Sequence, residues 1–179
     1  MNIAFIVILV IFIILILVGI IGIGFYNKLV FRKKKVIDKF NAVYMSLKER
    51  VDIIDSISNI ITTNKLHEDN ILMELNKMKE VILENSSVNE TLPLINESDD
   101  LLKKALSLDS IYDELLKDKI YMNLKDTFKN NQYKIMYSIE IYNEEVEEYN
   151  NYKSKGIANV ISKIFRFSDY SYYKKENDI

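Results

Sequence analysis

The chain has 179 residues and a net charge of −2, and 49% of its residues are hydrophobic. It contains no cysteine, one histidine and one proline, which excludes disulfides, thiolate metal sites and thiol catalysis. Three of its four glycines fall within the first 24 residues, so glycine-rich phosphate-binding loops are excluded as well. A chain of this size has room for one compact domain, and so few turn-forming residues predict long helices.

The first segment is apolar throughout. No charged side chain precedes Lys28, and residues 3–25 are only Ile, Val, Leu, Phe, Ala and Gly. At about 1.5 Å per residue this segment spans about 34 Å, enough to cross a hydrocarbon core of about 30 Å. The main alternative is a secretory signal peptide, which needs a basic start, a shorter apolar stretch and a cleavage site of small residues. We therefore predict a retained transmembrane anchor over residues 1–27.

Residues 28–39 form a basic collar directly after the anchor and lead into the first helix of the soluble part. The collar has six basic residues against one acidic residue, a net charge of +5, so the rest of the chain carries −7. An acidic remainder argues against nucleic acid as a partner. Because Lys and Arg are enriched on cytoplasmic flanks, we predict a single-pass protein of the cell membrane with its N-terminus outside and its soluble domain in the cytoplasm.

The lipid bilayer is thus the first expected partner. The basic collar either binds anionic lipids or serves only as a topology signal. Glycines 19, 22 and 24 lack the GxxxG spacing of a dimer face, so they support self-association only weakly and leave it open. The residues expected at the membrane interface are Tyr26, Lys28, Arg32, Lys33, Lys34 and Lys35.

Beyond the collar, apolar residues recur at intervals of three and four, the period of a helix. They are Phe40, Val43, Leu47, Ile54, Ile57 and Ile61. Neither Pro nor Gly interrupts the chain between Phe25 and residue 62, so one helix is expected to run from the anchor to a break at 62–64. Arg50 stands where this stripe requires an apolar residue. It needs a buried partner, or it reaches solvent at the edge while Val51 fills the core.

Three further helices are predicted. The second covers residues 66–83, and residues 85–96 read as a loop around Pro93. The third opens at Ser98, an N-cap followed by two aspartates that favour the positive end of a helix. The fourth covers residues 118–155 and stops before Gly156. Its apolar stripe consists of Tyr121, Leu124, Phe128, Ile135, Ile139, Tyr142, Val146 and Tyr149.

No strand pattern competes with these helices. The predicted fold class is all-α, a single N-terminal transmembrane helix followed by an antiparallel up-and-down bundle of about four main helices over residues 40–167. Residues 157–167 form a short amphipathic piece whose apolar face we expect to cover the open end of the bundle, with membrane-surface binding as the alternative. Residues 168–179 form a polar, Tyr-rich tail that we expect to be frayed.

Several short motifs carry a family resemblance. They are YNKLV at 26–30, LKERVDIIDS at 47–56, His67-Glu68, Tyr142-Asn143, Tyr149-Asn150 and FRF at 165–167. In this order and register, over residues 26–167, the chain resembles the LemA family. It departs from the family pattern at Glu49, at residues 55–56 and at residues 156–157, and a central motif survives only as Tyr112 and Leu115. The resemblance implies one anchor and an up-and-down bundle of four main helices, and it brings no established enzymatic activity.

The sequence offers no catalytic constellation. His67-Glu68 is its one imidazole beside a carboxylate, and no Glu precedes His67 at the spacing of a bundle metal site, so we expect a surface or helix-cap histidine. We predict no catalytic residue, no metal site and no cofactor. An acidic cluster on the fourth helix either faces solvent, holds a cation or pairs with basic residues of a neighbouring helix. Its members are Glu140, Glu144, Glu145, Glu147 and Glu148.

The two Tyr-Asn dipeptides lie one heptad apart, so Tyr142 and Tyr149 face one direction, with Asn143 and Asn150 beside them. We expect buried tyrosines whose hydroxyls bond across the bundle, and asparagines that fix its register. The alternative is a polar groove for a peptide or a small ligand. With Arg50, these four are the candidate structural or interaction residues.

We therefore expect a membrane-anchored, non-enzymatic helical-bundle scaffold or adaptor that presents an interaction surface to an unidentified protein partner at the cytoplasmic face of the membrane. The alternative is a membrane-tethered sensor or envelope-stress component that binds a peptide or lipid in its bundle. A closed apolar core near Arg50 and Tyr142 would exclude the sensor, whereas a deep polar cavity there would weaken the scaffold hypothesis.

Overall fold

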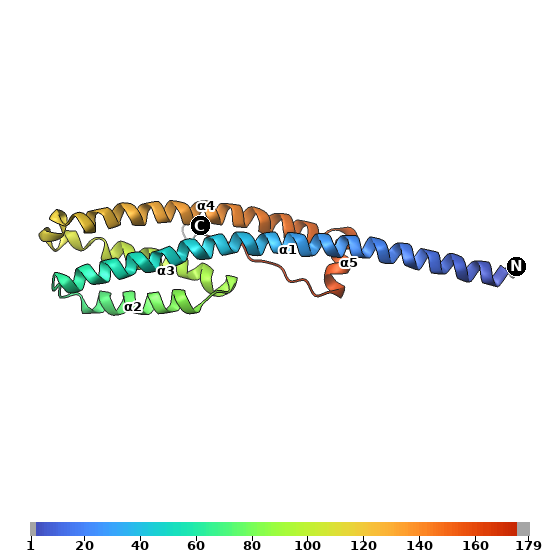
Figure 1. Cartoon of the computed structure of the whole chain (residues 1–179), viewed down its shortest axis with the longest axis horizontal. Coiled ribbons are helices and arrows are strands. Elements are labelled where there is room, and N and C mark those ends of the chain that lie inside the picture. The colour runs from blue at the N-terminus through green and yellow to red at the C-terminus, as the bar shows by residue number, and fades with distance from the viewer. Residues whose placement is uncertain (1–2, 175–179) are drawn as a thin grey trace. The chain divides into compact units, whose positions relative to one another are not determined.

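The computed structural model describes residues 3–174. Every regular element in this range is a helix, and no strand occurs among these residues, which confirms the all-α class. The elements, labelled in Figure 1, are α1 (Ile3–Thr63), α2 (Asp69–Glu84), α3 (Val88–Ala105), two 3₁₀ turns η1 (Leu108–Ser110) and η2 (Asp113–Lys117), α4 (Lys119–Lys153) and α5 (Gly156–Ile164).

The chain divides into two compact units. The first unit combines Met1–Asp38 with Glu144–Ser171, and the second combines Lys39–Asn143 with Tyr172–Ile179. Helices α1 and α4 therefore each contribute residues to both units. The boundaries that the sequence suggests for anchor, collar, bundle and tail stay predictions.

Helix α1 runs unbroken from the apolar segment to Thr63, as the sequence predicts. It stops in a Schellman motif, in which Lys65 takes a left-handed φ of 51° and the Leu66 amide donates to the Ile61 carbonyl at 3.0 Å. Among the described residues, α1 is the one helix long and apolar enough to cross a membrane, judged by length and composition. Its most apolar window has a mean hydropathy of 3.7 and is wholly unburied, so it is a candidate membrane span.

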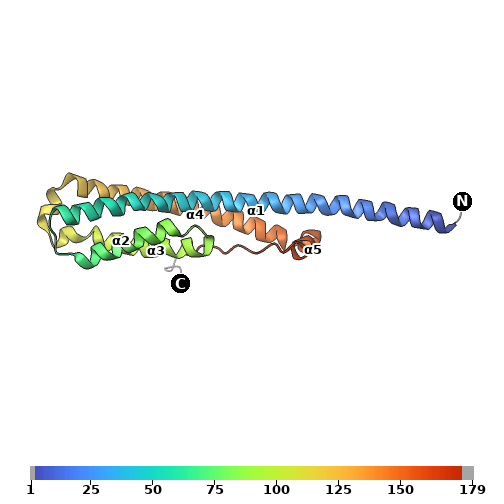
Figure 2. The ribbon, with the colours of Figure 1, turned by 60° about the horizontal axis from the view of Figure 1, so that its bottom comes forward.

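The core of the second unit begins with the predicted stripe of α1, whose six members are all buried. Helices α2 and α3 lie side by side in this unit (Figures 1 and 2). The buried residues of α2 are Ile71, Leu75 and Ile82, whereas Leu72 and Met78, also expected to point inward, are half-buried. Helix α2 begins three residues later than predicted.

The predicted loop around Pro93 is wrong. Helix α3 begins at Val88, so Pro93 lies inside it and Ser98 is a buried residue of its middle instead of an N-cap. Ser87 takes the N-cap position, and its hydroxyl donates to the Glu90 carboxylate at 2.5 Å and to no backbone amide. Pro93 has no backbone N–H, so one helical hydrogen bond is missing. Pro93 lies on the exposed side of the helix, where the carbonyl that lacks its partner can bind water.

Helix α4 follows its predicted course. The Asp118 carboxylate caps it by accepting from the amides of Ile120 and Tyr121 at 2.8 and 3.2 Å. All eight residues of the predicted stripe are buried. The helix ends at Lys153, two residues earlier than predicted, and Gly156, with φ of +48°, opens α5. A side chain at that φ would be strained, which is why glycine suits the corner.

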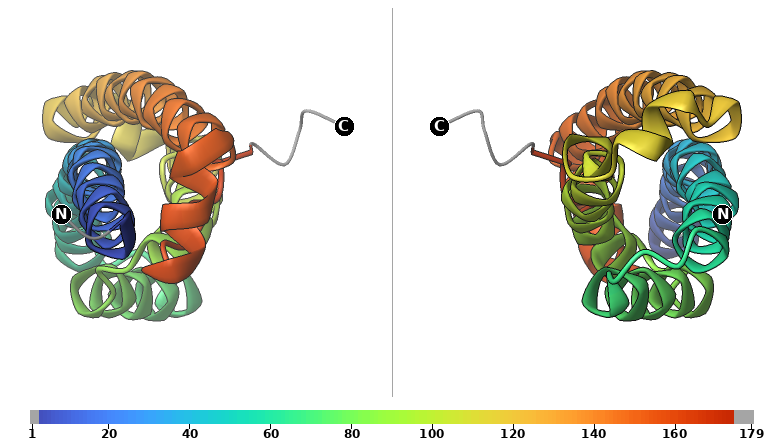
Figure 3. Two further views of the ribbon diagram at one scale, coloured as in Figure 1. Left: turned by 90° about the vertical axis from the view of Figure 1, so that its right-hand side faces the viewer. Right: turned by 90° about the vertical axis from the view of Figure 1, so that its left-hand side faces the viewer.

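Helix α5 lies crosswise to α1 within the first unit (Figures 1 and 3). It buries Ala158 and Ser162. The apolar face that we expected to pack is largely exposed instead, at Ile157, Val160, Ile164 and Phe165.

The expectation of a frayed tail is also wrong for residues 168–173, whose backbone is extended and hydrogen-bonded to α4. Residues 175–179 lie outside the described part of the chain.

Candidate binding site

Arg50 is 1% exposed in the second unit, where α1 meets α3 and α4. Its Nη2 forms an ion pair with the Asp99 carboxylate. Its Nη1 donates to the Ile95 carbonyl at 2.8 Å and to the Ser98 hydroxyl at 2.6 Å, and its Nε donates to Asn131 Oδ1 at 2.9 Å. The interpretation that Arg50 reaches solvent is therefore wrong, and the expectation of a buried partner is confirmed.

The surroundings of Arg50 complete a polar network inside an apolar core. Asn131 is buried, and its Nδ2 donates to the Ser46 carbonyl of α1 at 2.8 Å. The guanidinium lies over the Phe128 ring, 5.7 Å from its centroid. Burial lowers the pKa of Arg50, and the Asp99 charge and hydrogen bond act against that shift. Because guanidinium stays protonated in proteins, the network holds a fixed charge pair.

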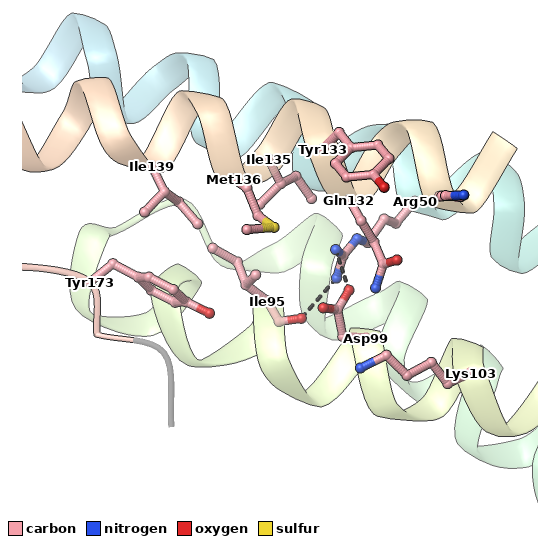
Figure 4. Close-up of a pocket in the computed structure, with 11 residues that line it drawn as sticks. Arg50, Ile95, Asp99, Lys103, Gln132, Tyr133, Ile135, Met136, Ile139 and Tyr173 are labelled. Carbon is pink, nitrogen blue, oxygen red and sulfur yellow. Dashed lines mark hydrogen bonds and ion pairs between the residues drawn. The ribbon is translucent and has the colours of Figure 1, made fainter. Parts of the chain in front are cut away.

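A surface pocket of about 460 Å³ opens beside this network (Figure 4). Arg50 and Asp99 lie at one side of it, and Tyr173 of the tail lies at the other. Two lysines, Lys103 and Lys129, also line it, and both are exposed. The remaining lining side chains are mostly apolar: Ile95, Gln132, Tyr133, Ile135, Met136 and Ile139. The cavity is thus apolar in its walls, with a buried ion pair and two exposed cations around it.

The asparagines of the Tyr-Asn dipeptides hold the chain's own C-terminal segment. In the first unit, Asn150 Nδ2 donates to the Tyr170 carbonyl at 2.9 Å, and its Oδ1 accepts from the Tyr170 amide at 3.3 Å. In the second unit, Asn143 binds Tyr173 in the same way, at 3.0 and 2.9 Å. Each side-chain amide therefore pairs with an extended residue as a neighbouring β-strand would.

The spacing of these two clamps has a simple geometric origin. Seven residues of α-helix rise about 10.5 Å, and three residues of extended chain rise about 10 Å. Asn143 and Asn150 are seven apart, and Tyr170 and Tyr173 are three apart. A heptad repeat of asparagine on a helix is therefore matched to every third residue of an extended strand.

Tyr142 and Tyr149 are both fully buried, as expected. The Tyr149 hydroxyl donates to the Ser168 carbonyl at 2.9 Å, so it bonds to the C-terminal segment and not to another helix. Its ring makes an edge contact with Tyr170. The Tyr142 ring makes an edge contact with Phe40 of α1. The dipeptides thus combine a core aromatic with a clamp for the extended segment.

The basic collar is partly neutralised within the first unit. Arg32 pairs with Glu148 at 2.7 Å and Lys35 with Glu145 at 3.2 Å, so for these two glutamates the alternative of pairing with basic residues of a neighbouring helix holds, and Glu148 is also exposed. Lys28 and Arg32 also lie over the Tyr152 ring. Tyr26 contacts the rings of Phe165 and Phe167. Lys33 and Lys34 are exposed.

A family model described as the LemA family matches residues 39–179, most of the chain. The chain belongs to the LemA family. A search of the curated proteins finds no match.

Two of the positions at which this LemA protein departs from the family pattern form ion pairs. Glu49 pairs with Lys134 of α4. Asp55 pairs with Lys79 of α2 at 2.6 Å. Both carboxylates are roughly half-exposed, so each pair contributes little to stability.

Several residues of the LemA site escape sequence reasoning. Asp99 and Ser98 carry the partner groups of Arg50 but read as a helix N-cap. Asn131 does leave a signal, since it falls between Phe128 and Ile135 in the apolar stripe of α4, where an apolar residue is expected. His67 is exposed, and among residues 3–174 no three His, Asp or Glu side chains converge into a metal site.

We expect the free energy of unfolding of the wild-type protein to fall at alkaline pH because Tyr149 ionises. The variant Tyr149→Phe should lack this part of the fall. Burial, with Tyr170 and Asp169 nearby, raises the pKa of Tyr149 to about 12. The unfolded tyrosine ionises near 10, so the folded state retains the proton between these values and stability falls as pH rises from 10 to 12. Below pH 10 the wild type gains about 1 kcal/mol from the hydroxyl hydrogen bond.

Denaturant unfolding at several pH values checks this, with the 295 nm absorbance as a reading of tyrosinate. The wild type should lose its advantage over Tyr149→Phe above pH 10. If the difference in unfolding free energy between the wild type and Tyr149→Phe stayed constant up to pH 12, the raised pKa of Tyr149 would be contradicted. Tyr121, whose pKa burial also raises to about 12, is present in both proteins and cancels.

Proposed function

We propose that this LemA-family protein is a membrane-tethered, non-enzymatic adaptor whose helical part docks a segment of a protein partner. The observation that carries this proposal is the pocket of about 460 Å³ beside Arg50 and its continuation in exposed apolar side chains of α4. Tyr133, Met136 and Tyr137 are 60%, 54% and 66% exposed, and the first two line the pocket. Exposed aromatic and Met side chains of this kind are enriched at interaction surfaces.

The chemistry of the pocket indicates its occupant. Its walls suit an apolar side chain, and Lys103 and Lys129 suit nearby carboxylates. The donors of Arg50 go to Asp99, Ser98, Ile95 and Asn131, which supports a structural role for the arginine and a binding role for the cavity. A partner segment that combines an apolar anchor with acidic residues would fit.

The arrangement that presents this pocket is proposed to be an antiparallel up-and-down bundle of four main helices, α1 to α4. It is supported by the links of Arg50 and Asn131 among α1, α3 and α4, and by the packing of α2 on α3.

The soluble part is proposed to lie in the cytoplasm, because the six basic residues of the collar follow the candidate span and none precedes it. A cysteine at Ser86, which is exposed, would report this without disturbing the Ser87 cap. In intact cells it should resist a membrane-impermeant maleimide and react after permeabilisation. Labelling from outside would reverse the orientation.

A photo-crosslinking residue at Met136 tests the adaptor proposal in native membranes. The expected result is a discrete protein adduct, weakened when Lys103 and Lys129 are both changed to Glu. Met73, which is 66% exposed on α2 and does not line this pocket, is the matched control and should give no such adduct. Equal adducts at the two positions, or no adduct at Met136, would count against docking at the pocket.

A second candidate function is a membrane-tethered sensor of a small ligand or lipid. The volume of the pocket favours it, since cavities of about 300–1,000 Å³ are typical of small-ligand sites. The same experiment separates the two functions. Adducts at Met136 that carry lipid or a small molecule, with no protein, would favour the sensor.

A further inference from the structure

We propose that α5 is an interfacial helix that lies on the bilayer crossed by α1, with its exposed apolar face among the acyl chains just below the headgroups. The proposal rests on the proposed membrane span of α1. It goes beyond the adaptor function, because it assigns a second membrane contact to the C-terminal part of the chain.

The first observation is that α5 has two distinct faces. Ala158 and Ser162, four residues apart, are its buried side. Ile157, Val160 and Ile164, at spacings of three and four, share another side and are 49%, 58% and 65% exposed. The fully buried side of the helix is thus made of small residues, Ile161 is half-buried, and the other three large apolar residues are uncovered.

The second observation is where α5 packs. An ideal Cβ built on Gly22 would lie 3.7 Å from the Ile161 Cδ1 atom. The Tyr26 ring lies 4.8 Å from the Phe165 ring and 5.7 Å from the Phe167 ring, between centroids. Gly22 lies in the last turn of the apolar segment, which ends at Phe25, and Tyr26 follows directly after it. In a helix that crosses a bilayer, this level is the boundary between hydrocarbon and headgroups, where tyrosine is enriched.

The third observation is direction. In Figures 1 and 3, α5 runs crosswise to α1 within the first unit. If α1 crosses the membrane, α5 therefore lies near the membrane plane, the orientation of an interfacial helix. Lys163 and Arg166, both exposed, flank the apolar face and can reach the headgroups.

Lipid is the occupant that these observations favour over a second copy of the chain. The exposed face of α5 adjoins the apolar segment of α1, of which the most apolar window is also wholly unburied. Both surfaces are therefore apolar and exposed, and both belong to the first unit, where α5 approaches α1 at Gly22. A bilayer covers both at once, whereas a protein partner would have to cover the α5 face and leave lipid on α1.

Single cysteines labelled with the fluorophore NBD test this in the full-length chain, because no native thiol interferes. The protein is placed in nanodiscs at one copy per disc, with and without lipids that carry a nitroxide on the acyl chain. Val160→Cys and Ile164→Cys should each lose most of their fluorescence to the nitroxide. Leu15→Cys in the apolar segment is the positive control, and Ser86→Cys, in the loop between α2 and α3, should keep its emission.

The outcomes separate this proposal from its premise. Quenching at Leu15 without quenching at Val160 and Ile164 would overturn the interfacial helix and leave the anchor standing. No quenching at Leu15 would remove the anchor and the proposal together. Blue-shifted emission at Val160 without nitroxide quenching would mean that protein covers the face, which also overturns the assignment to lipid. Both substitutions are at exposed sites, and circular dichroism checks that the helices are retained.

Discussion

Arg50→Met is expected to lower the free energy of unfolding by about 3–5 kcal/mol, the usual cost of removing one partner of a buried ion pair. The substitution keeps much of the side-chain volume but leaves the Asp99 carboxylate without its counter-charge. It also removes the donors that satisfy Ile95, Ser98 and Asn131 in a region with little access to water. Each buried polar group left unsatisfied adds to the loss.

Chemical unfolding of the full-length protein in detergent micelles, followed by circular dichroism, measures this effect. Lys103→Met is the matched control, because Lys103 pairs with Asp100 at 3.5 Å on an exposed surface and should change stability by less than about 0.5 kcal/mol. The double variant Arg50→Met/Asp99→Leu should recover to within about 1–2 kcal/mol of wild type, since apolar groups can replace a buried pair. A loss as small as that of Lys103→Met would show that Arg50 is not a stabilising centre.

The double substitution Asn143→Ala/Asn150→Ala is expected to release the extended C-terminal segment while α4 stays helical. Each asparagine makes two hydrogen bonds to the backbone of one tyrosine, worth about 1–3 kcal/mol per site. Because the amides of Tyr170 and Tyr173 are the donors to the asparagine oxygens, their hydrogen exchange reports the clamps directly. Exchange at each should accelerate roughly 5- to 150-fold.

Asn151→Ala provides the control for this experiment. Asn151 is exposed on the same turn of α4 as Asn150, and its side chain makes no contact with the segment in the part of the chain that is described. Its replacement should leave exchange at Tyr170 and Tyr173 unchanged. If the double variant also left exchange unchanged, the segment would be held by its tyrosine packing and not by the asparagine amides.

Local periodicity determined the long helices. The course of α1 from the apolar segment to Thr63 and the buried stripe of α4 both follow from apolar residues at spacings of three and four with no intervening breaker. The apolar segment and the basic collar could likewise be predicted, because the hydrophobicity and the charge of a residue do not depend on tertiary contacts. The start of α3 was predicted wrongly, because Pro93 suggested a loop, whereas Ser87 and Glu90, six and three residues before Pro93, have the spacing typical of a helix start.

The helix ends also show the limits of local rules. Lys65 and Arg166 adopt left-handed φ values of 51° and 54° at positions where glycine is the usual residue. Buried Leu66, which follows Lys65, supports the first of these turns. Gly156, read as the stop of α4, instead opens α5. The side of α5 that faces outward could not be predicted from its amphipathic pattern, because its fully buried residues are the small Ala158 and Ser162, while most of its large apolar residues are exposed.

The sequence by itself determined that Arg50 must have a special environment and that the Tyr-Asn pairs share one direction, because helix geometry fixes which residues share a face. Only the tertiary structure decided the partners. Asp99 is 49 residues away from Arg50 and Asn131 is 81 away, and which groups meet in a core depends on how separate helices pack. The same is true of the asparagine clamps. Their partner is a segment without regular structure of its own. It is held by tertiary hydrogen bonds, to α4 and through the Tyr173 hydroxyl to Asn96 of α3, so it leaves no periodic signal in the sequence.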